Sequence, residues 1–203
     1  MKTSGNIPPG ATAHQGIPQA ASRLARAGLI VEPSSWLLEN LDLLPPGART
    51  LDVACGRGRH ALLLAAAGFP VEAVDRKVGL IATLRATAER LDLPLRAEVR
   101  DLETGTADLG TADLGTADYE LVLVFHYLHR PLFPALLRAL APGGLLLYET
   151  FTVEQAKRGK PREPDFLLEP GELRRRVAPL EVLREREGEF EGRMVAAVAA
   201  RKT

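Results

Sequence analysis

The 203-residue sequence has a single cysteine, Cys55, a formal net charge of zero and few aromatic residues. One cysteine excludes an internal disulfide and supplies no set of thiolate ligands, so we expect no metal site. Nucleic-acid-binding domains are usually basic, so a nucleic-acid partner is not expected. No apolar run approaches the ~20 residues of a membrane-spanning helix, and the N-terminus lacks a secretory-signal pattern. We therefore expect a cytoplasmic protein that binds a small molecule and no membrane; no pattern indicates an oligomeric state.

A chain of this length is expected to form one domain around one core. Residues 1–21 are rich in small and polar residues without a periodic pattern, which predicts a flexible tail or a lid over an active site. Residues 22–203 are then the single domain. Three near copies of the motif G-T-A-D-L occupy residues 105–119. A five-residue period fits no solenoid repeat, so we interpret the copies as an extended loop.

A strand pattern, a glycine-rich turn and a helix start follow one another near residue 56. The apolar segment 50–54 leads into Gly56 and Gly58, and an alanine- and leucine-rich helix pattern follows. Glycine has no Cβ, so the backbone can come close to a ligand, and the first N–H groups of a helix are free to bind one. Open α/β sheets bind their ligands at such carboxyl ends of strands.

Acidic residues mark three successive predicted strands. Asp52 lies inside the first strand, Asp75 ends the next, and Asp101 follows the segment 95–100. The glycine spacing alone also fits a dinucleotide site. Asp52, however, would repel a pyrophosphate and suits a cationic ammonium. The three acids therefore favour an S-adenosyl amino acid over NAD as the ligand.

Strand and helix patterns alternate along most of the sequence. The apolar run Tyr119–Phe125 predicts a central strand buried on both faces. Helix patterns at residues 78–93 and 131–140 flank it. Two final strand patterns, 180–190 and 194–200, predict a hairpin. We therefore predict an α/β fold, a Rossmann-like doubly wound sheet of seven strands, mostly parallel with the last strand antiparallel.

The motif at residues 51–58 resembles motif I of the class I S-adenosylmethionine-dependent methyltransferases, and Asp75 and Asp101 match the two downstream acids of that superfamily. Residues 140–147, L-A-P-G-G-L-L-L, resemble its turn into the fifth strand. Together with Y-E-T-F at residues 148–151, the first motif further resembles the tellurite-resistance (TehB-like) group of small methyltransferases. The resemblance implies an enzyme that transfers a methyl group from S-adenosylmethionine to a small molecule, such as a thiol or a tellurite- or selenite-type acceptor.

The resemblance also implies roles for individual residues. The expected cofactor-binding residues are Asp52, Ala54, Gly56, Gly58, Asp75, Arg76, Asp101, Leu102 and Phe125. The expected catalytic residues, at the ends of the fourth and fifth strands, are His126, Tyr127 and Glu149. The candidate substrate-binding residues are Arg57, Arg59, His60, Arg130, Arg158 and Arg162. Because the loop at residues 151–166 carries four cations, we further expect it to form, with the arginines of the glycine turn, a positively charged entrance for an anionic acceptor.

Three other functions fit parts of the sequence. A methyltransferase acting on a tRNA, a protein or a metabolite oxygen or nitrogen is one alternative, although F-H-Y-L at residues 125–128 differs from the N-P-P-Y-type loop of enzymes that methylate base amino groups. An NAD-dependent oxidoreductase would use the same glycine turn, but Asp52 and the P-G-G turn at residues 142–144 disfavour it. A binding-only relative would keep the cofactor acids without catalysis.

Overall fold

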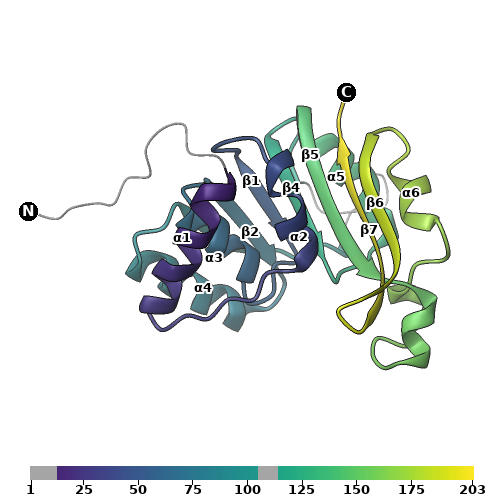
Figure 1. Ribbon diagram of the computed structural model, residues 1–203, viewed down its shortest axis with the longest axis horizontal. Helices are drawn as coiled ribbons and strands as arrows, with labels where there is room; N and C mark the ends of the chain where they lie inside the picture. Colours follow the sequence, from purple (N-terminus) through teal and green to yellow (C-terminus); the bar gives the residue numbers. More distant parts are fainter. Residues whose placement is uncertain (1–12, 105–113) are drawn as a thin grey trace, which may run out of the picture.

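The computed structural model describes residues 13–104 and 114–203. One sheet runs through the molecule, with its seven strands in the order β3-β2-β1-β4-β5-β7-β6 (Figure 1). The strands are β1 (Thr50–Val53), β2 (Val71–Asp75), β3 (Leu95–Val99), β4 (Tyr119–Phe125), β5 (Leu140–Phe151), β6 (Glu181–Phe190) and β7 (Arg193–Arg201). β1 to β5 pair in parallel, and β7 runs antiparallel to both β5 and β6. The predicted fold class is confirmed.

Short helices cover both faces of this sheet. The α-helices are α1 (Ala13–Arg26), α2 (Ser35–Glu39), α3 (Arg59–Ala66), α4 (Val78–Arg90), α5 (Phe133–Ala139) and α6 (Glu172–Arg176). The 3-10 turns are η1 (Leu41–Leu43), η2 (Arg130–Leu132), η3 (Val153–Lys157) and η4 (Pro164–Phe166). α1 to α4 pack on one face, and α5 and α6 pack on the other. Within the described ranges, no helix has the length and apolar content needed to cross a membrane.

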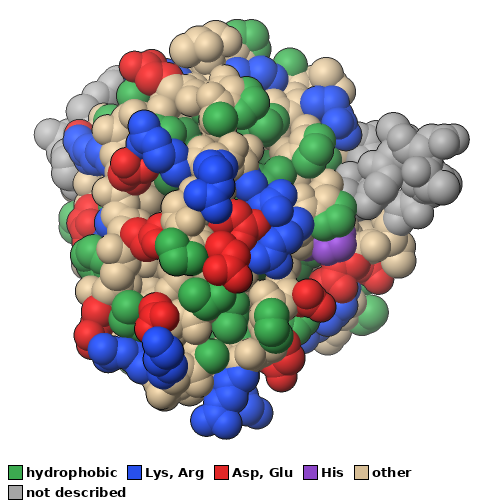
Figure 2. Space-filling model, turned by 90° about the vertical axis from the view of Figure 1, so that its right-hand side faces the viewer, with side chains coloured by type: hydrophobic (Ala, Val, Ile, Leu, Met, Phe, Trp, Pro, Cys, Tyr) green, Lys and Arg blue, Asp and Glu red, His purple; other side chains and the backbone are tan. Residues whose placement is uncertain are grey.

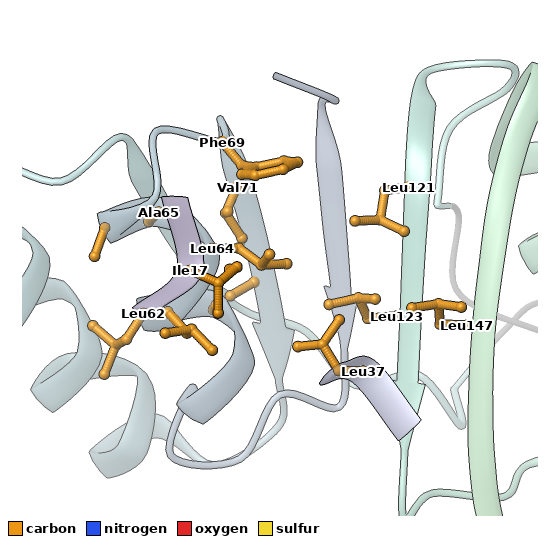
Figure 3. Packing of buried hydrophobic residues seen from close by; sticks show 14 of the residues in the cluster. Ile17, Leu37, Leu62, Leu64, Ala65, Phe69, Val71, Leu121, Leu123 and Leu147 are labelled. Atoms are coloured by element: carbon orange, nitrogen blue, oxygen red, sulfur yellow. The ribbon is translucent and has the colours of Figure 1, made fainter. Parts of the chain in front are cut away.

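The central strand β4 is buried on both faces, as its continuous apolar run predicts. Leu121 and Leu123 join the cluster that contains Ile17 of α1 (Figure 3). Val122 and Val124, which point to the opposite face, pack in the cluster with α5 and α6. This alternation is the two-residue period of a strand, and it holds β4 between the two helical layers.

The N-terminal tail predicted up to residue 21 ends earlier, because α1 already begins at Ala13. Ile17, Ala20 and Leu24 are buried, and they recur every three or four residues on one face of α1. Their spacing is the signal for this helix, which Gly16 and Pro18, both poor helix formers, made hard to recognise. The first 12 residues, and most of the G-T-A-D-L copies at residues 105–113, lie outside the described residues.

Candidate functional site

A cleft of about 950 Å³ lies at the carboxyl ends of the parallel strands. The segments that follow β1, β2, β3 and β4 form its floor, together with the end of β5. Residues 29–32, between α1 and α2, form one further wall, and Pro161 and Phe166 contribute from the long loop after β5. The cleft is therefore at the place where open α/β sheets bind their ligands.

The two glycines of the turn after β1 have different tasks. Gly56 lines the cleft with a φ of 58°, and a Cβ built on it would meet nothing within 4 Å. Its backbone is therefore open to a ligand. Gly58 (φ 73°) begins α3, and a Cβ on it would come within 2.6 Å of the Leu84 side chain. Gly58 thus serves the packing of α3 on α4, and it does not itself line the cleft.

The three acids predicted at the strand ends all line this cleft. Asp52 is buried, and its Oδ2 accepts a hydrogen bond from the Ala61 backbone N–H at 3.1 Å. Burial raises the pKa of Asp52 to about 7, although the Ala61 N–H and the positive charge of Arg59 oppose the shift. Asp101 is exposed, and its Oδ1 accepts from the backbone N–H of Glu103 at 3.0 Å.

Asp75 connects the glycine turn to the end of β2. Its Oδ2 accepts the Gly56 backbone N–H at 2.9 Å, and its Oδ1 accepts the Lys77 backbone N–H at the same distance. Each carboxylate oxygen has a second lone pair, so both can still accept from a ligand hydroxyl. Asp75 therefore shapes the turn and faces the cleft at once.

Tyr127 lies near the β2 and β3 side of the cleft, although the sequence predicted a catalytic place for it. Burial raises its pKa, and the charges that act on it most are those of Glu103 and Arg76, which form an ion pair at 3.2 Å. The Tyr127 hydroxyl is buried and has no hydrogen-bond partner within the described structure. Since buried polar groups are nearly always paired, this hydroxyl is suited to a polar atom of a ligand. Leu102, beside it in the cleft lining, is buried.

His126 occupies the first position after β4, with a positive φ of 57°. Its ring stacks on Phe151 with the ring centroids 4.8 Å apart. Guanidinium nitrogens of Arg59 and Arg193 lie 3.5 Å from its Nδ1 and its Nε2. Burial, followed by the positive charges of the two arginines, lowers the pKa of His126 to about 4. At neutral pH a neutral imidazole therefore sits between two cations, a group we call the Arg59–His126–Arg193 cluster.

Glu149 was predicted to be a catalytic group on the rim of the cleft. In the structure it is buried and forms an ion pair with Arg186. Its Oε1 accepts from the Ser34 hydroxyl and its Oε2 accepts from the Arg186 guanidinium, each at 2.7 Å. Only 4% of the Glu149 side chain and 8% of the Arg186 side chain are exposed. The alternation of β5 explains the place, because Glu149 points to the same face as Leu147, beneath α2. Its Oε1 is 3.7 Å from Nε2 of His126.

His60 lines the cleft but is not a cation for the substrate. Its Nε2 accepts the Ser34 backbone N–H at 3.1 Å, and its ring lies against Phe125 with centroids 4.1 Å apart. Burial lowers the pKa of His60 well below its ordinary value, and the charge of Arg59 lowers it further. Arg57, by contrast, is an exposed cation of the cleft lining.

Arg130 lies outside the cleft and holds a loop. Its guanidinium pairs with Glu172 at 2.8 Å through Nε, and it donates to the backbone oxygens of Asp165 and Leu167 at 3.0 and 2.8 Å. The predicted contact with a substrate is therefore replaced by a contact that fixes the segment around η4. That segment carries Phe166, which does line the cleft.

Two of the four cations of the loop after β5, which the sequence placed at a positively charged entrance, are paired with acids. Arg158 pairs through both terminal nitrogens with Glu189 of β6, each at 2.7 Å, and Lys157 pairs with Glu154. Arg162 is exposed and is not among the residues that line the cleft. Figure 2 shows basic and acidic side chains interspersed on the face of β6 and α6. Lys157 and Arg158 are therefore neutralised, and the cations that line the cleft include Arg57 and Arg59, with Arg193 beside His126.

Residues 50–144 match the family model described as a methyltransferase domain. Among solved structures, the fold is similar to TehB from Haemophilus influenzae (TM-score 0.72, 19% identity, 91% of this chain and 67% of that chain). It is also similar to an S-adenosylmethionine-dependent methyltransferase from Mesorhizobium loti (TM-score 0.66, 18% identity, 83% and 98%). The domain match and the fold confirm the predicted resemblance to class I S-adenosylmethionine-dependent methyltransferases. TehB is among the structural neighbours, as the narrower motif match predicts.

Two curated proteins match shorter segments. One is Hemagglutinin 1 of Eikenella corrodens, 44% identical over 54 residues, which is 27% of this chain and 18% of that protein. The other is the 23S rRNA (uracil(1939)-C(5))-methyltransferase RlmD of Halomonas elongata, 34% identical over 73 residues, which is 36% and 15%. The chain thus spans less than a fifth of the length of either relative.

Proposed function

We propose that this protein transfers the methyl group of S-adenosylmethionine to a small anionic acceptor with a soft nucleophilic atom, such as a thiolate or a tellurite- or selenite-type anion. The observation that carries the proposal is the Arg59–His126–Arg193 cluster, which places two guanidiniums beside a neutral imidazole at the end of β4. The solved neighbour named as an S-adenosylmethionine-dependent methyltransferase supports the donor, and the neighbour named TehB supports the resemblance on which this class of acceptor rests.

The residues of the cleft fit the cofactor. Asp52 would hold the ammonium group, Asp75 the ribose hydroxyls and Asp101 the adenine amino group, and all three line the cleft. The open backbone at Gly56 and the unpaired Tyr127 hydroxyl leave room and a donor for such a ligand. When bound, S-adenosylmethionine supplies a methyl group on a positively charged sulfur, which is already an activated leaving group.

The end of the cleft at β4 is poorly suited to accept a proton. His126 has a pKa of about 4 between two cations, and Glu149 is engaged by Ser34 and Arg186. A general base works best with a pKa near the operating pH. An acceptor that arrives as an anion needs no base. Its lone pair forms the new bond to the methyl carbon, the electrons of the broken carbon–sulfur bond stay on the cofactor sulfur, and no proton moves.

The test is transfer of a tritiated methyl group from S-adenosylmethionine across a panel of small thiols, selenite, tellurite and tRNA. We expect label in the small anions and none in tRNA. Arg193→Gln should lower kcat/KM for the acceptor by roughly tenfold or more, the usual effect of losing a charge-assisted contact. Its affinity for S-adenosylhomocysteine should be unchanged. Arg90→Gln, an exposed arginine on α4, is the matched control. Label in tRNA alone would refute the proposal.

A nucleic-acid acceptor is the second candidate. The match to RlmD, named as an rRNA methyltransferase, is the observation in its favour. Zero net charge and the interspersed charges on the face of β6 and α6 argue against it (Figure 2). Binding to RNA depends on phosphate contacts and weakens steeply with salt. Tight, salt-sensitive binding of tRNA would therefore favour this candidate over a small acceptor.

A further inference from the structure

Two large apolar side chains among the residues that line the cleft are well exposed to solvent. Ile30 is 87% exposed and Phe166 is 47% exposed, and both line the cleft. They come from separate walls, Ile30 from the segment between α1 and α2 and Phe166 from η4. Single exposed apolar residues need no explanation, but two at one concave site indicate contact with an apolar group.

Hydrogen bonds and a ring contact connect both walls to the Arg59–His126–Arg193 cluster. On one side, Arg59 donates to the backbone oxygen of Glu32 at 3.0 Å, two residues from Ile30. On the other side, His126 stacks on Phe151, whose backbone oxygen accepts the N–H of Leu168 at 2.9 Å. The cationic end of the cleft and the two apolar walls are therefore parts of one connected site.

We infer that the acceptor is an organic anion, with its charged nucleophile beside Arg59 and His126 and an alkyl or aryl body between Ile30 and Phe166. The inference rests on the proposed function and narrows its substrate class to organic thiolates. An inorganic oxyanion has no apolar surface to bury, so it gains nothing from these two side chains. Ile30 and Phe166 are then specificity-determining residues.

The chemistry is balanced without a further reactant. The thiol loses its proton to water before it binds, and the thiolate sulfur forms the bond to the methyl carbon. The bonding pair between that carbon and the cofactor sulfur stays on the cofactor sulfur. The products are a neutral thioether and neutral S-adenosylhomocysteine, so the negative charge that Arg59 and Arg193 attract disappears on reaction. Loss of that charge favours product release.

The first experiment measures kcat/KM with benzenethiol and with hydrosulfide in the unmodified protein and in Ile30→Ser and Phe166→Ser. A substitution that slows methyl transfer to both acceptors equally leaves the ratio of the two values unchanged, so the ratio reports only on discrimination between them. We expect the benzenethiol-to-hydrosulfide ratio to fall about tenfold in each variant, since one apolar contact changes discrimination by about 10–200-fold. Leu38→Ser is the control, because Leu38 is 41% exposed and does not line the cleft. Unchanged ratios in both variants overturn the inference.

The second experiment uses no turnover. Calorimetry with S-adenosylhomocysteine present compares benzenesulfonate with methanesulfonate, two monoanions that share the sulfonate group and differ in the size of the apolar body. We expect benzenesulfonate to bind about tenfold more tightly, and Phe166→Ser to remove the difference. Equal affinities in the unmodified protein overturn the inference while methyl transfer to hydrosulfide still upholds the proposed function. Failure to bind S-adenosylhomocysteine together with no transfer to any acceptor overturns both.

Discussion

Ionisation of Asp52 opposes folding of the ligand-free protein. Burial raises its pKa from 3.8 to about 7, so the folded state holds this proton more tightly than the unfolded chain does. The contribution of Asp52 to the free energy of unfolding is therefore highest below pH 4 and falls as the pH rises from about 4 to about 7. A shift of about 3 units, at about 1.36 kcal/mol each, corresponds to about 4 kcal/mol lost above pH 7.

Asp52→Asn removes the charge and keeps an oxygen that can accept the Ala61 N–H. We predict that it stabilises the ligand-free protein by about 4 kcal/mol at pH 8. At pH 5 we expect about 2 kcal/mol, because only part of the cost of burying Asp52 has developed at that pH. The control is Asp92→Asn, an exposed residue with a φ of 50°, a backbone region that asparagine tolerates well. Its effect should be small and equal at both pH values.

Urea unfolding curves at pH 5 and pH 8 measure both variants, and the slope checks that the transition stays two-state. The same Asp52→Asn protein should bind S-adenosylhomocysteine more weakly, because the ammonium loses its counter-ion. A stabilisation that does not grow with pH, or a loss of stability at pH 8, would falsify the conclusion that Asp52 is a buried carboxyl group whose ionisation is unfavourable. Weaker binding with greater stability is the pattern expected of a residue kept for its ligand.

Three further changes test the structure. Glu149→Gln should lower the free energy of unfolding measured in urea by about 1–3 kcal/mol, because the buried Arg186 loses one carboxylate partner and retains only the half-exposed Glu39; the double change with Arg186→Met should recover most of the loss, and no recovery would count against the pair. Gly58→Ala should lower the thermal midpoint, since its Cβ would meet Leu84, and Leu84→Ala should rescue part of it; equal loss with and without Leu84 would contradict the packing role. Arg130→Ala should raise the acceptor KM and leave cofactor affinity unchanged in calorimetry, whereas an unchanged KM would show that the loop needs no such hold.

Most of the cofactor side of the cleft could be predicted from the sequence. Parallel strands end at one edge of the sheet, so Asp52, Asp75 and Asp101 had to meet once their strands were recognised. The glycine turn carried its own local signal. What spacing could not show is that Gly58 serves helix packing, because Leu84 lies on a different helix.

The acceptor side depends on contacts between distant parts of the chain, and there the sequence was less informative. Arg193 follows a hairpin turn, where an arginine is ordinary, and only the pairing of β7 with β5 brings it to His126, 67 residues away. Arg158 and Arg162 were expected at the entrance because they are cations near a strand end. Glu189, on another strand, neutralises Arg158, and no local pattern predicts that pairing.

The order of the strands makes the Arg59–His126–Arg193 cluster depend on a segment far along the chain from Arg59. Arg59 belongs to the first strand-to-helix turn, whereas Arg193 begins β7, which is inserted between β5 and β6. A nascent chain that has emerged only to residue 192 already contains the matched segment, residues 50–144, and all three acids of the cleft. It lacks one of the two guanidiniums at His126. During synthesis the three acids can therefore come together first, and the Arg59–His126–Arg193 cluster is complete only when the C-terminal hairpin has joined the sheet.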